Sequence, residues 1–408
     1  MLEGRASHRT ETAICPFLCD NFHMRQILIV LLVSTASFAQ STPKAQRSQT
    51  TEGLRGVSVV SGRVAWASGT HGTYLRTVDA GGHWIASSVS GAEALDFRAV
   101  VAFSADEAFL MSAGPGEQSR IYHTVDAGQH WSLQITNSNP KGFFDSMAFW
   151  DSTHGIVVGD PIADETGTLK FEILVTDDGQ TWSQSPSAGL PAALPGEGAF
   201  AASNSCIAIL PSATVAASET PGRHDPFKQA EPASSLRIKT IVHPDSNIWF
   251  ATGGSVARVF HSADQGQTWQ AVQTPIAHGP DSAGIFSIAF RDATHGVIAG
   301  GDYKHPDEDG PNLAFTRDGG KTWTVPRIHP QAYFSAVAYD LKASREYENA
   351  IFAVNPSFIF DLRAPENPTR ISPGKKAELK FNAVSPFAGG GALFVGPKGT
   401  LVSVAASH

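Results

Sequence analysis

The stretch that decides the fold is Thr77-Val78-Asp79-Ala80-Gly81-Gly82-His83-Trp84. In such an octapeptide the Asp carboxylate folds back onto backbone N–H groups, and a Gly supplies a backbone angle that other residues resist. A hydroxyl at the first position adds a second local hydrogen bond, and the closing Trp packs its apolar face beneath the turn. The octapeptide therefore predicts a tight turn between two antiparallel strands.

The same pattern, Ser/Thr-x-Asp-x-Gly-x-Thr/His-Trp, occurs five times along the chain. Its aspartates are Asp79, Asp126, Asp177, Asp264 and Asp318, and the third copy has Val175 in the place of the hydroxyl residue. Because each Asp lies where a turn needs a short acceptor, we interpret all five as structural residues rather than as metal ligands or catalytic acids.

The spacing of the octapeptides predicts an all-β fold, a seven-bladed β-propeller over residues 53–408. Successive aspartates are 47, 51, 87 and 54 residues apart, and one four-stranded blade takes roughly 40–50 residues. We interpret the long interval as a blade that begins near residues 198–204 and carries an insertion loop at about 211–246; an extra blade hidden there is the alternative. Strand-like runs at 336–354 and 381–404 predict blades six and seven.

The N-terminal region predicts export. Met24 and Arg25 precede an apolar run at 27–33, and Ser37-Phe38-Ala39 has the small-x-small form of a signal-peptidase site. We therefore expect a leader over residues 1–39, with Met24 as the true start, and a periplasmic or extracellular protein; an uncleaved anchor is the alternative. Residues 40–52 are polar and predict a flexible linker.

Composition narrows the class of function. The chain has 30 Lys and Arg against 38 Asp and Glu, a net charge of −8, which argues against binding to duplex nucleic acid. After the leader only Cys206 remains, so no intramolecular disulfide is expected. The sequence has no phosphate-binding loop or metal-ligand motif, and we predict neither a cofactor nor a metal site.

A second repeated phrase sharpens the assignment. Phe149-Trp150-Asp151-Ser152-Thr153-His154-Gly155 matches Phe290-Arg291-Asp292-Ala293-Thr294-His295-Gly296. The octapeptides are Asp boxes, the bacterial neuraminidase repeat, and together with this phrase they resemble the photosystem II assembly and stability factors of cyanobacteria and chloroplasts and their exported bacterial relatives. The resemblance implies a monomeric, non-enzymatic, exported propeller that binds a protein partner, such as a subunit of a membrane complex.

The sialidases share Asp boxes and provide the rival hypothesis of a carbohydrate-active propeller, either a glycosidase or a lectin. Such enzymes need an Arg triad, a Tyr–Glu nucleophile pair and an Asp acid/base. The first Arg of that triad usually lies in an Arg-Ile-Pro phrase; here Arg237 and Arg327 occur late and lack the Pro. The sequence therefore identifies no catalytic residue, and a glycan remains an alternative partner.

Propeller geometry predicts where a ligand would bind. Entries to the first strands and exits from the second strands meet at the channel mouth, on the face opposite the Asp boxes. The candidate ligand-binding residues there are Arg98, Asp145, Asp160, Glu197, Asp302 and Tyr303. Convergent polar groups in a concavity indicate a binding site, for a protein segment, a small ligand or a cation. The alternative is that these residues cap strands and satisfy backbone groups.

Overall fold

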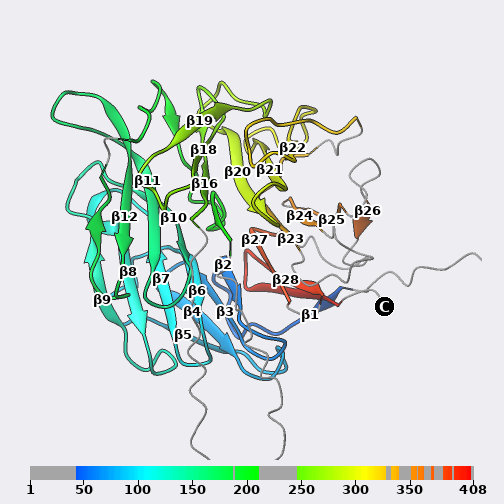
Figure 1. The fold of residues 1–408 in the computed structure, drawn as a ribbon. Coiled ribbons are helices and arrows are strands. Elements are labelled where there is room, and N and C mark those ends of the chain that lie inside the picture. Colours follow the sequence, from blue (N-terminus) through cyan, green and yellow to red (C-terminus); the bar gives the residue numbers. More distant parts are fainter. Residues whose placement is uncertain are drawn as a thin grey trace, which may run out of the picture. The chain divides into compact units, whose positions relative to one another are not determined.

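The computed structural model describes residues 43–186, 189–210, 246–327, 332–339, 351–355, 357–362, 369–371, 380–387 and 390–405. The predicted leader (1–39) and the predicted insertion loop (211–246, except Ser246) lie outside these residues. The described part is built from strands and one short 3-10 helix, η1 (Gly116–Gln118) (Figure 1). None of its helices has the length and apolar character needed to cross a membrane.

The strands form seven antiparallel sheets, the blades of a β-propeller. Blade one is β2 (Leu54–Val59), β3 (Ala65–Gly69), β4 (Thr73–Thr77) and β5 (Ile85–Ser88). Blade two is β6 (Phe97–Ala102), β7 (Ala108–Ser112), β8 (Arg120–Thr124) and β9 (Ser132–Thr136). Blade three is β10 (Phe144–Phe149), β11 (Gly155–Ala163), β12 (Leu169–Thr176) and β13 (Ser183–Gln184). Blade four is β15 (Ile207–Ile209), β16 (Ile248–Ala251), β18 (Arg258–Ser262) and β19 (Gln270–Gln273).

The last three blades depart from this simple order. Blade five is β20 (Ala283–Phe290), β21 (Gly296–Asp302) and β22 (Leu313–Thr316), with β17 (Gly253–Gly254) and β14 (Glu197–Gly198) added beside β20. Blade six is β23 (Ala336–Tyr339), β24 (Ile351–Val354), β25 (Ile359–Asp361) and β26 (Thr369–Ile371). Blade seven is β27 (Ala383–Pro386), β28 (Gly391–Gly396), β29 (Thr400–Ala405) and β1 (Lys44–Ala45).

The first strands of the blades close a ring. β2 contacts β6, β6 contacts β10, and the contacts continue through β15, β20 and β23 to β27, which contacts β2 again. These strands therefore surround the propeller channel, and the later strands of each blade lie progressively further out. The predicted seven-bladed fold is confirmed.

The two ends of the propeller meet in blade seven. β1 pairs with β29 through Lys44 opposite Ser403, and Gln46 N–H donates to the Leu401 carbonyl at 2.9 Å. Figure 1 shows the blue strand β1 beside the red strands of this blade. Residues 44–45 thus form a paired strand inside the segment predicted to be a flexible linker, because the outer edge of β29 offers unpaired backbone groups.

The start of blade four also differs from the prediction. Residues 198–204 were expected to form its first strand, but β15 begins only at Ile207. Instead, β14 pairs with β17, and β17 pairs with β20 through Gly253 opposite Gly284. The segment between β14 and β15 therefore forms no strand pairing. It lies at the channel mouth described below.

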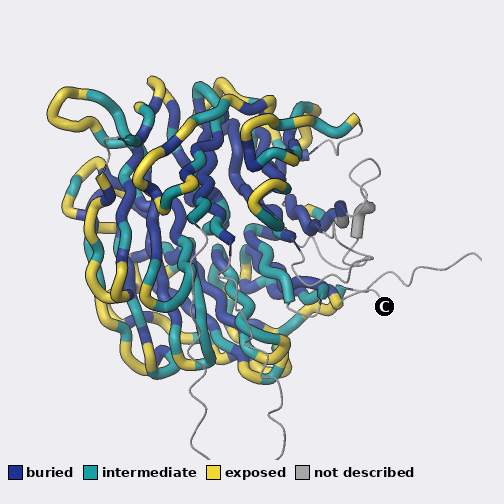
Figure 2. Tube along the Cα trace, in the orientation of Figure 1, coloured by how far each residue is buried: buried dark blue, intermediate teal, exposed yellow. Residues whose placement is uncertain are grey.

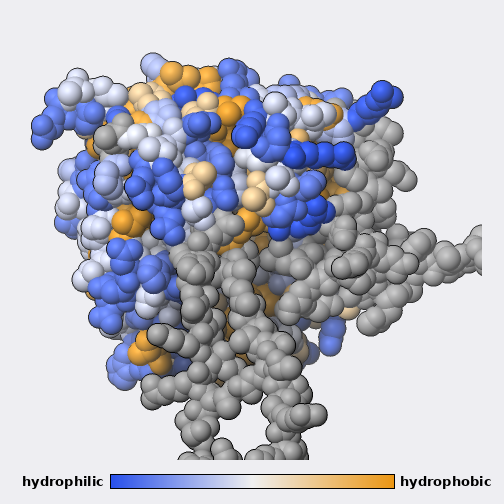
Figure 3. Space-filling view, in the orientation of Figure 1, coloured by the Kyte–Doolittle hydropathy of each residue, from blue (hydrophilic) through white to orange (hydrophobic). Residues whose placement is uncertain are grey.

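Apolar side chains fill the space between neighbouring blades. Along the strands the tube in Figure 2 is mostly buried, while the hairpin ends are exposed. Trp249 of blade four is fully buried, stacks on Phe290 of blade five at 3.7 Å between ring centroids, and donates its indole N–H to the Gly319 carbonyl. On the face shown in Figure 3, hydrophilic residues cover most of the described surface.

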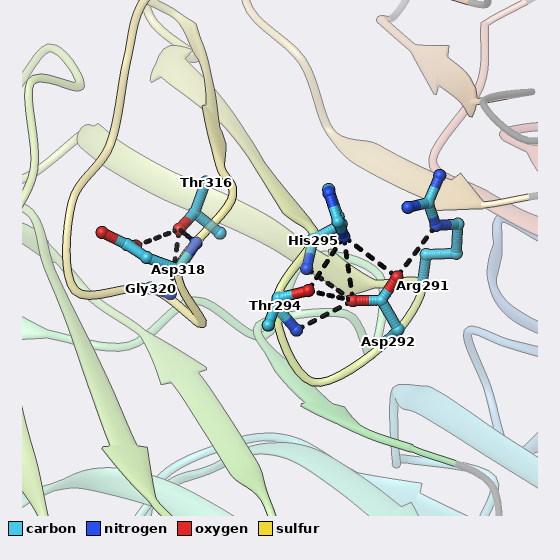
Figure 4. Close-up of polar contacts among 7 residues, drawn as sticks. All are labelled: Arg291, Asp292, Thr294, His295, Thr316, Asp318 and Gly320. Carbon is cyan, nitrogen blue, oxygen red and sulfur yellow. Dashed lines mark hydrogen bonds and ion pairs between the residues drawn. The ribbon is translucent and has the colours of Figure 1, made fainter.

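The Asp-box turns have the predicted local chemistry. In the fifth box, the Thr316 hydroxyl donates to Asp318 Oδ1 at 2.8 Å and accepts the Gly320 N–H (Figure 4). Asp318 also accepts the backbone N–H and the hydroxyl of Thr322, and these hydrogen bonds lower the pKa of Asp318 to about 2. The box therefore stabilises its own turn, which directly follows β22.

The third box corrects the prediction by one residue. Its turn is closed by Asp178, which accepts the Thr176 hydroxyl at 3.2 Å and the Thr181 N–H at 2.7 Å, and not by Asp177. The other boxes have two successive left-handed residues, such as Ala127 and Gly128, whereas this one has Gly179 alone. The box is one residue shorter, which explains why Val175 occupied the hydroxyl position in the predicted alignment.

The second repeated phrase forms the turn between the first two strands of a blade. Asp292 Oδ1 accepts the backbone N–H groups of Thr294 and His295, both at 2.8 Å, and the Thr294 hydroxyl at 2.7 Å (Figure 4). Asp151 makes the corresponding bonds with Thr153 and His154 in blade three. Both aspartates are thus engaged within their own turns.

Candidate functional site

The same short pattern lies at or next to the start of six of the seven first strands: a large buried apolar residue, a variable residue and a small residue. The six triplets are Leu54-Arg55-Gly56, Phe97-Arg98-Ala99, Phe144-Asp145-Ser146, Ile285-Phe286-Ser287, Phe334-Ser335-Ala336 and Phe381-Asn382-Ala383. The apolar residue packs between blades, and the small residue lies where the chain enters the paired part of the strand. All six variable residues line one cavity of about 400 Å³.

A β-bulge turns four of these variable residues away from the strand ladder. Leu54 pairs with Gly69 and Gly56 with Ser68, so Arg55 is skipped, and the ladder likewise skips Arg98, Asp145 and Phe286. Bulges commonly re-aim a side chain next to a functional site. Here the repeated irregularity brings residues from blades that are distant in sequence to one place.

One side of the cavity carries two arginines. The guanidinium of Arg98 donates to Asp96 Oδ2 at 2.9 Å and to the Ala201 carbonyl at 3.0 Å. Arg55 Nε lies 3.6 Å from Asp96 Oδ1. Both arginine side chains are about one-third exposed. Asp96 thus orients the guanidinium groups of both arginines toward the cavity. Their remaining N–H groups can donate hydrogen bonds to a carboxylate or a carbonyl oxygen of a ligand.

The other side carries two buried carboxyl groups from blade three. Asp145 is 1% exposed, and burial raises the pKa of Asp145 well above its usual range, with the nearby Asp160 charge raising it further against the pull of Arg98. Burial also raises the pKa of Asp160, which accepts the Ala199 N–H at 3.0 Å. Desolvation therefore favours the protonated, neutral forms of both groups.

The chain's own segment between β14 and β15 crosses the channel mouth. Ala199 bonds to Asp160 and Ala201 to Arg98, so this segment is held by blades two and three. Asn204 accepts the Met147 N–H at 2.7 Å, and the Ser203 hydroxyl donates to the Ser335 carbonyl of blade six. The released start of blade four therefore forms one wall of the cavity.

Aromatic rings form a further wall. Phe200 stacks on Phe286 with ring centroids 4.0 Å apart, and Tyr333 meets Phe286 edge-on at 4.9 Å. Tyr303 stands at the rim, 49% exposed, with its ring 6.0 Å from Phe286. Such a surface suits the apolar stem of a bound side chain.

A second cavity of about 360 Å³ adjoins the first. It shares four lining residues with the central cavity: Asp160, Ala199, Phe200 and Asp281. Its remaining lining includes Lys141, Pro161 and the glycines of β14 and β17. The two cavities therefore share a wall formed by these four residues.

The structure brings together four of the six predicted site residues. Arg98, Asp145, Asp160 and Tyr303 line the central cavity. Asp302 does not line this cavity. Its carboxylate is hydrogen-bonded to the Lys304 backbone N–H and to Nδ1 of His305 within its own loop.

Glu197 lines only the second cavity, and its side chain is fully buried. It forms a two-pronged ion pair with Arg258 and accepts the Thr252 hydroxyl at 2.7 Å and the Leu194 N–H at 2.8 Å. Both carboxylate oxygens are thus engaged, and they attach the crossing segment to blade four.

Sequence reasoning missed several residues of the central cavity: Arg55, Phe143, Phe200, Asp281, Phe286, Tyr333, Ser335 and Asn382. A signal for four of them exists, because Arg55, Phe286, Ser335 and Asn382 occupy the middle of the apolar–variable–small triplet. No comparable pattern marks Phe200 or Asp281, which reach the cavity through irregular segments.

The described residues contain no group of three or more His, Cys, Asp or Glu side chains that could hold a metal ion. Cys206 is buried beside this site, and burial raises the pKa of its thiol. The site therefore consists of two arginines, two buried carboxyl groups and an aromatic wall.

Comparisons with known proteins support the fold. The sequence matches no protein-family model and no curated protein. The structure is similar to YCF48 bound to a D1 peptide, with a TM-score of 0.57 and 15% identity over 89% of this chain and 97% of that one. It is also similar to YCF48 from Cyanidioschyzon merolae, with a TM-score of 0.54 and 16% identity over 90% of this chain and 99% of that one.

A glycoside hydrolase shares the architecture as well. The GH74 xyloglucanase from Xanthomonas campestris matches with a TM-score of 0.50 and 15% identity, over 89% of this chain and 53% of the enzyme. At such identities the likeness concerns the fold. The seven-bladed propeller fold is thus shared with solved structures of YCF48.

Proposed function

We propose that the protein is an exported, non-catalytic propeller that binds an extended segment of a partner protein at the channel mouth. The observation that carries this proposal is the delivery of six side chains of five chemical types from six first strands to one cavity, which adjoins a second. An extended peptide offers both the length to span the two cavities and the carbonyl or carboxylate oxygens that arginines bind.

Two further observations support a protein segment. A propeller of similar fold is bound to a peptide. The family resemblance favours a partner in or near a membrane complex, and the N-terminal leader, with its apolar run at 27–33, favours an exported location.

Arg55 provides the test. Its described contact is a 3.6 Å ion pair, so Arg55→Gln removes a cavity charge with little loss of structure. The matched control is Arg63→Gln in the turn after β2, at the other end of the same strand. We expect capture of a membrane protein from detergent-solubilised membranes by the wild type and by Arg63→Gln, and about tenfold weaker capture by Arg55→Gln. Equal capture by all three proteins would place the partner elsewhere, and the absence of any membrane protein would contradict the membrane partner.

A carbohydrate-active propeller is the second candidate, because two carboxyl groups with raised pKa lie in one cavity, as glycosidases require of their acid. The lining of that cavity contains two arginines rather than a triad. A panel of fluorogenic glycosides tests this candidate, and turnover that disappears in Asp145→Asn would establish it over the binding function.

A further inference from the structure

Asp145 is a buried acidic residue of the site with one carboxyl oxygen unsatisfied. Its side chain is 1% exposed, and Oδ2 has no hydrogen-bond partner among the described residues. Its other described contact is the backbone N–H of Ala201. A buried carboxyl oxygen without a partner is costly, since it has lost water and gained nothing in exchange. This group lines the cavity, so a bound cation could supply the missing interaction.

Asp160 is the accessible member of the pair. It lines both cavities, and the only described hydrogen bond of its carboxylate is the one that Oδ1 accepts from the Ala199 N–H. Phe144 pairs with Gly159 across β10 and β11, so Asp145 and Asp160 follow paired residues at the same end of blade three. Asp281, an exposed carboxylate, lines the same two cavities.

The cations nearby do not neutralise this side of the site. Arg55 and Arg98 both face Asp96, and Arg98 also binds the Ala201 carbonyl. Two further carboxyl groups, Asp160 and Glu172, raise the pKa of Asp145. The Cys206 thiol is also near, since the Asp145 charge raises the pKa of that thiol. Lys141 lines only the second cavity and forms no ion pair within 4.0 Å in the described structure. No ion pair to a protein cation within 4.0 Å is described for Asp145 or Asp160, and burial raises the pKa of both groups.

We propose that this acidic side is a subsite for a primary ammonium group, supplied by a lysine side chain of the bound segment. The ammonium is compact and has three donors, which suits Asp160 Oδ2 and the adjoining carboxyl groups. Its methylene stem lies along the stacked rings of Phe200 and Phe286. This subsite rests on the proposed peptide-binding function. It adds the orientation of the bound segment, whose lysine faces blade three and whose carboxylate or carbonyl oxygens face blades one and two.

Binding is coupled to proton release. In the empty site burial and the Asp160 charge raise the pKa of Asp145, which favours its protonated form. When the ammonium arrives, the positive charge favours the carboxylate, and Asp145 gives its proton to solvent. Affinity for lysine must then rise with pH through the titration range of Asp145, up to about tenfold per pH unit for one proton.

The test uses two blocked tripeptides and the full chain. The probes are acetyl-Gly-Lys-Gly-amide and acetyl-Gly-norleucine-Gly-amide, which differ only by the ammonium group. Calorimetric titrations at about pH 5 and about pH 8, in two buffers of different ionisation enthalpy, give the affinity and the number of protons released. We expect the lysine peptide to bind about tenfold or more tightly than the norleucine peptide, with a larger ratio at the higher pH.

Three variants complete the experiment. Asp145→Asn and Asp160→Asn keep the size of each side chain, and we expect both to remove the preference for lysine; Asp145→Asn also removes the proton release. The control is Asp106→Asn, an exposed aspartate in the β6–β7 turn, which must behave as the wild type. Equal affinity for the two peptides, a preference independent of pH, or no binding of the lysine peptide at millimolar concentration would overturn the ammonium subsite. None of these results affects the capture experiment with Arg55→Gln, in which equal capture by the wild type and both variants would instead overturn the proposed function.

Discussion

At the scale of single residues, carboxyl groups of one type perform opposite tasks in this propeller. Asp79 and Asp126, in exposed turns, accept backbone and ring N–H groups of the following histidines, which lower their pKa to about 2. Asp145 has a raised pKa because its carboxyl is buried. The environment thus separates aspartates that stabilise turns from an aspartate poised to exchange a proton.

The register of the third box can be tested with two neighbouring residues. Asp178→Ala removes the acceptor of the Thr176 hydroxyl and of the Thr181 N–H, and we expect the thermal midpoint to fall by about 1–3 °C. Asp177→Ala serves as the control, since the turn does not use its carboxylate, and its midpoint should stay near that of the wild type. Differential scanning fluorimetry measures both, and a larger loss for Asp177→Ala would contradict the shortened box.

Asp145 predicts a specific dependence of stability on pH. Its pKa is higher in the folded than in the unfolded protein, where it is about 3.9. The folded state therefore binds the extra proton, and the group lowers the free energy of unfolding progressively as pH rises above about 4. We expect Asp145→Asn to gain stability relative to the wild type between about pH 4 and pH 7 in urea titrations. Parallel stability curves for the two proteins would contradict the raised pKa.

At the scale of elements, aromatic residues of one blade are bonded to the turns of the next. Trp66 donates its indole N–H to the Ser104 carbonyl, Tyr74 donates its hydroxyl to the Gly128 carbonyl, and Trp249 donates to Gly319. Each bond joins a second or third strand to a neighbouring hairpin, so the blades are connected by directional contacts as well as by apolar packing.

The link through Trp249 can be isolated from ring packing. Trp249→Phe keeps an aromatic ring against Phe290 but leaves the Gly319 carbonyl without its donor, and we expect a loss of about 1–3 kcal/mol in the free energy of unfolding. Trp131→Phe is the matched control, because the indole N–H of Trp131 has no partner in the described structure. Equal losses in guanidinium denaturation would show that ring volume, and not the hydrogen bond, joins the blades.

At the scale of the whole molecule, closure of the ring depends on a segment far from the last blade in sequence. β1 covers the edge of β29, and Gln46 Oε1 accepts the indole N–H of the buried Trp84 at 2.7 Å. Blade seven is thus completed at its outer edge by residues that precede blade one.

Removal of this strand gives a direct test of closure. A chain beginning at Arg47 lacks β1 and Gln46, whereas a chain beginning at Pro43 retains both. We expect the shorter chain to unfold at a midpoint lower by about 3 °C or more and to self-associate through the uncovered edge of β29. Thermal denaturation and light scattering measure the two effects, and identical behaviour of the two chains would contradict closure by β1.

The sequence alone determined the repeating unit and hence the fold. The side-chain hydrogen bonds of the Thr and Asp in an Asp box lie within eight residues. The pattern around Asp79 or Asp318 can therefore be recognised without its surroundings, and repetition at blade spacing implies a ring. The triplets that contain Arg98 and Asp145 form a second local pattern, which lies at the starts of first strands.

Only the tertiary structure decided how the candidate site is composed. Asp145 and Ala201, or Phe200 and Phe286, belong to different blades and meet because the ring closes and because the start of blade four leaves its sheet. The same packing engages Glu197 with Arg258 and leaves Asp145 Oδ2 without a partner. Burial and charge at the channel mouth are properties of the assembled ring, and for that reason no local pattern could reveal them.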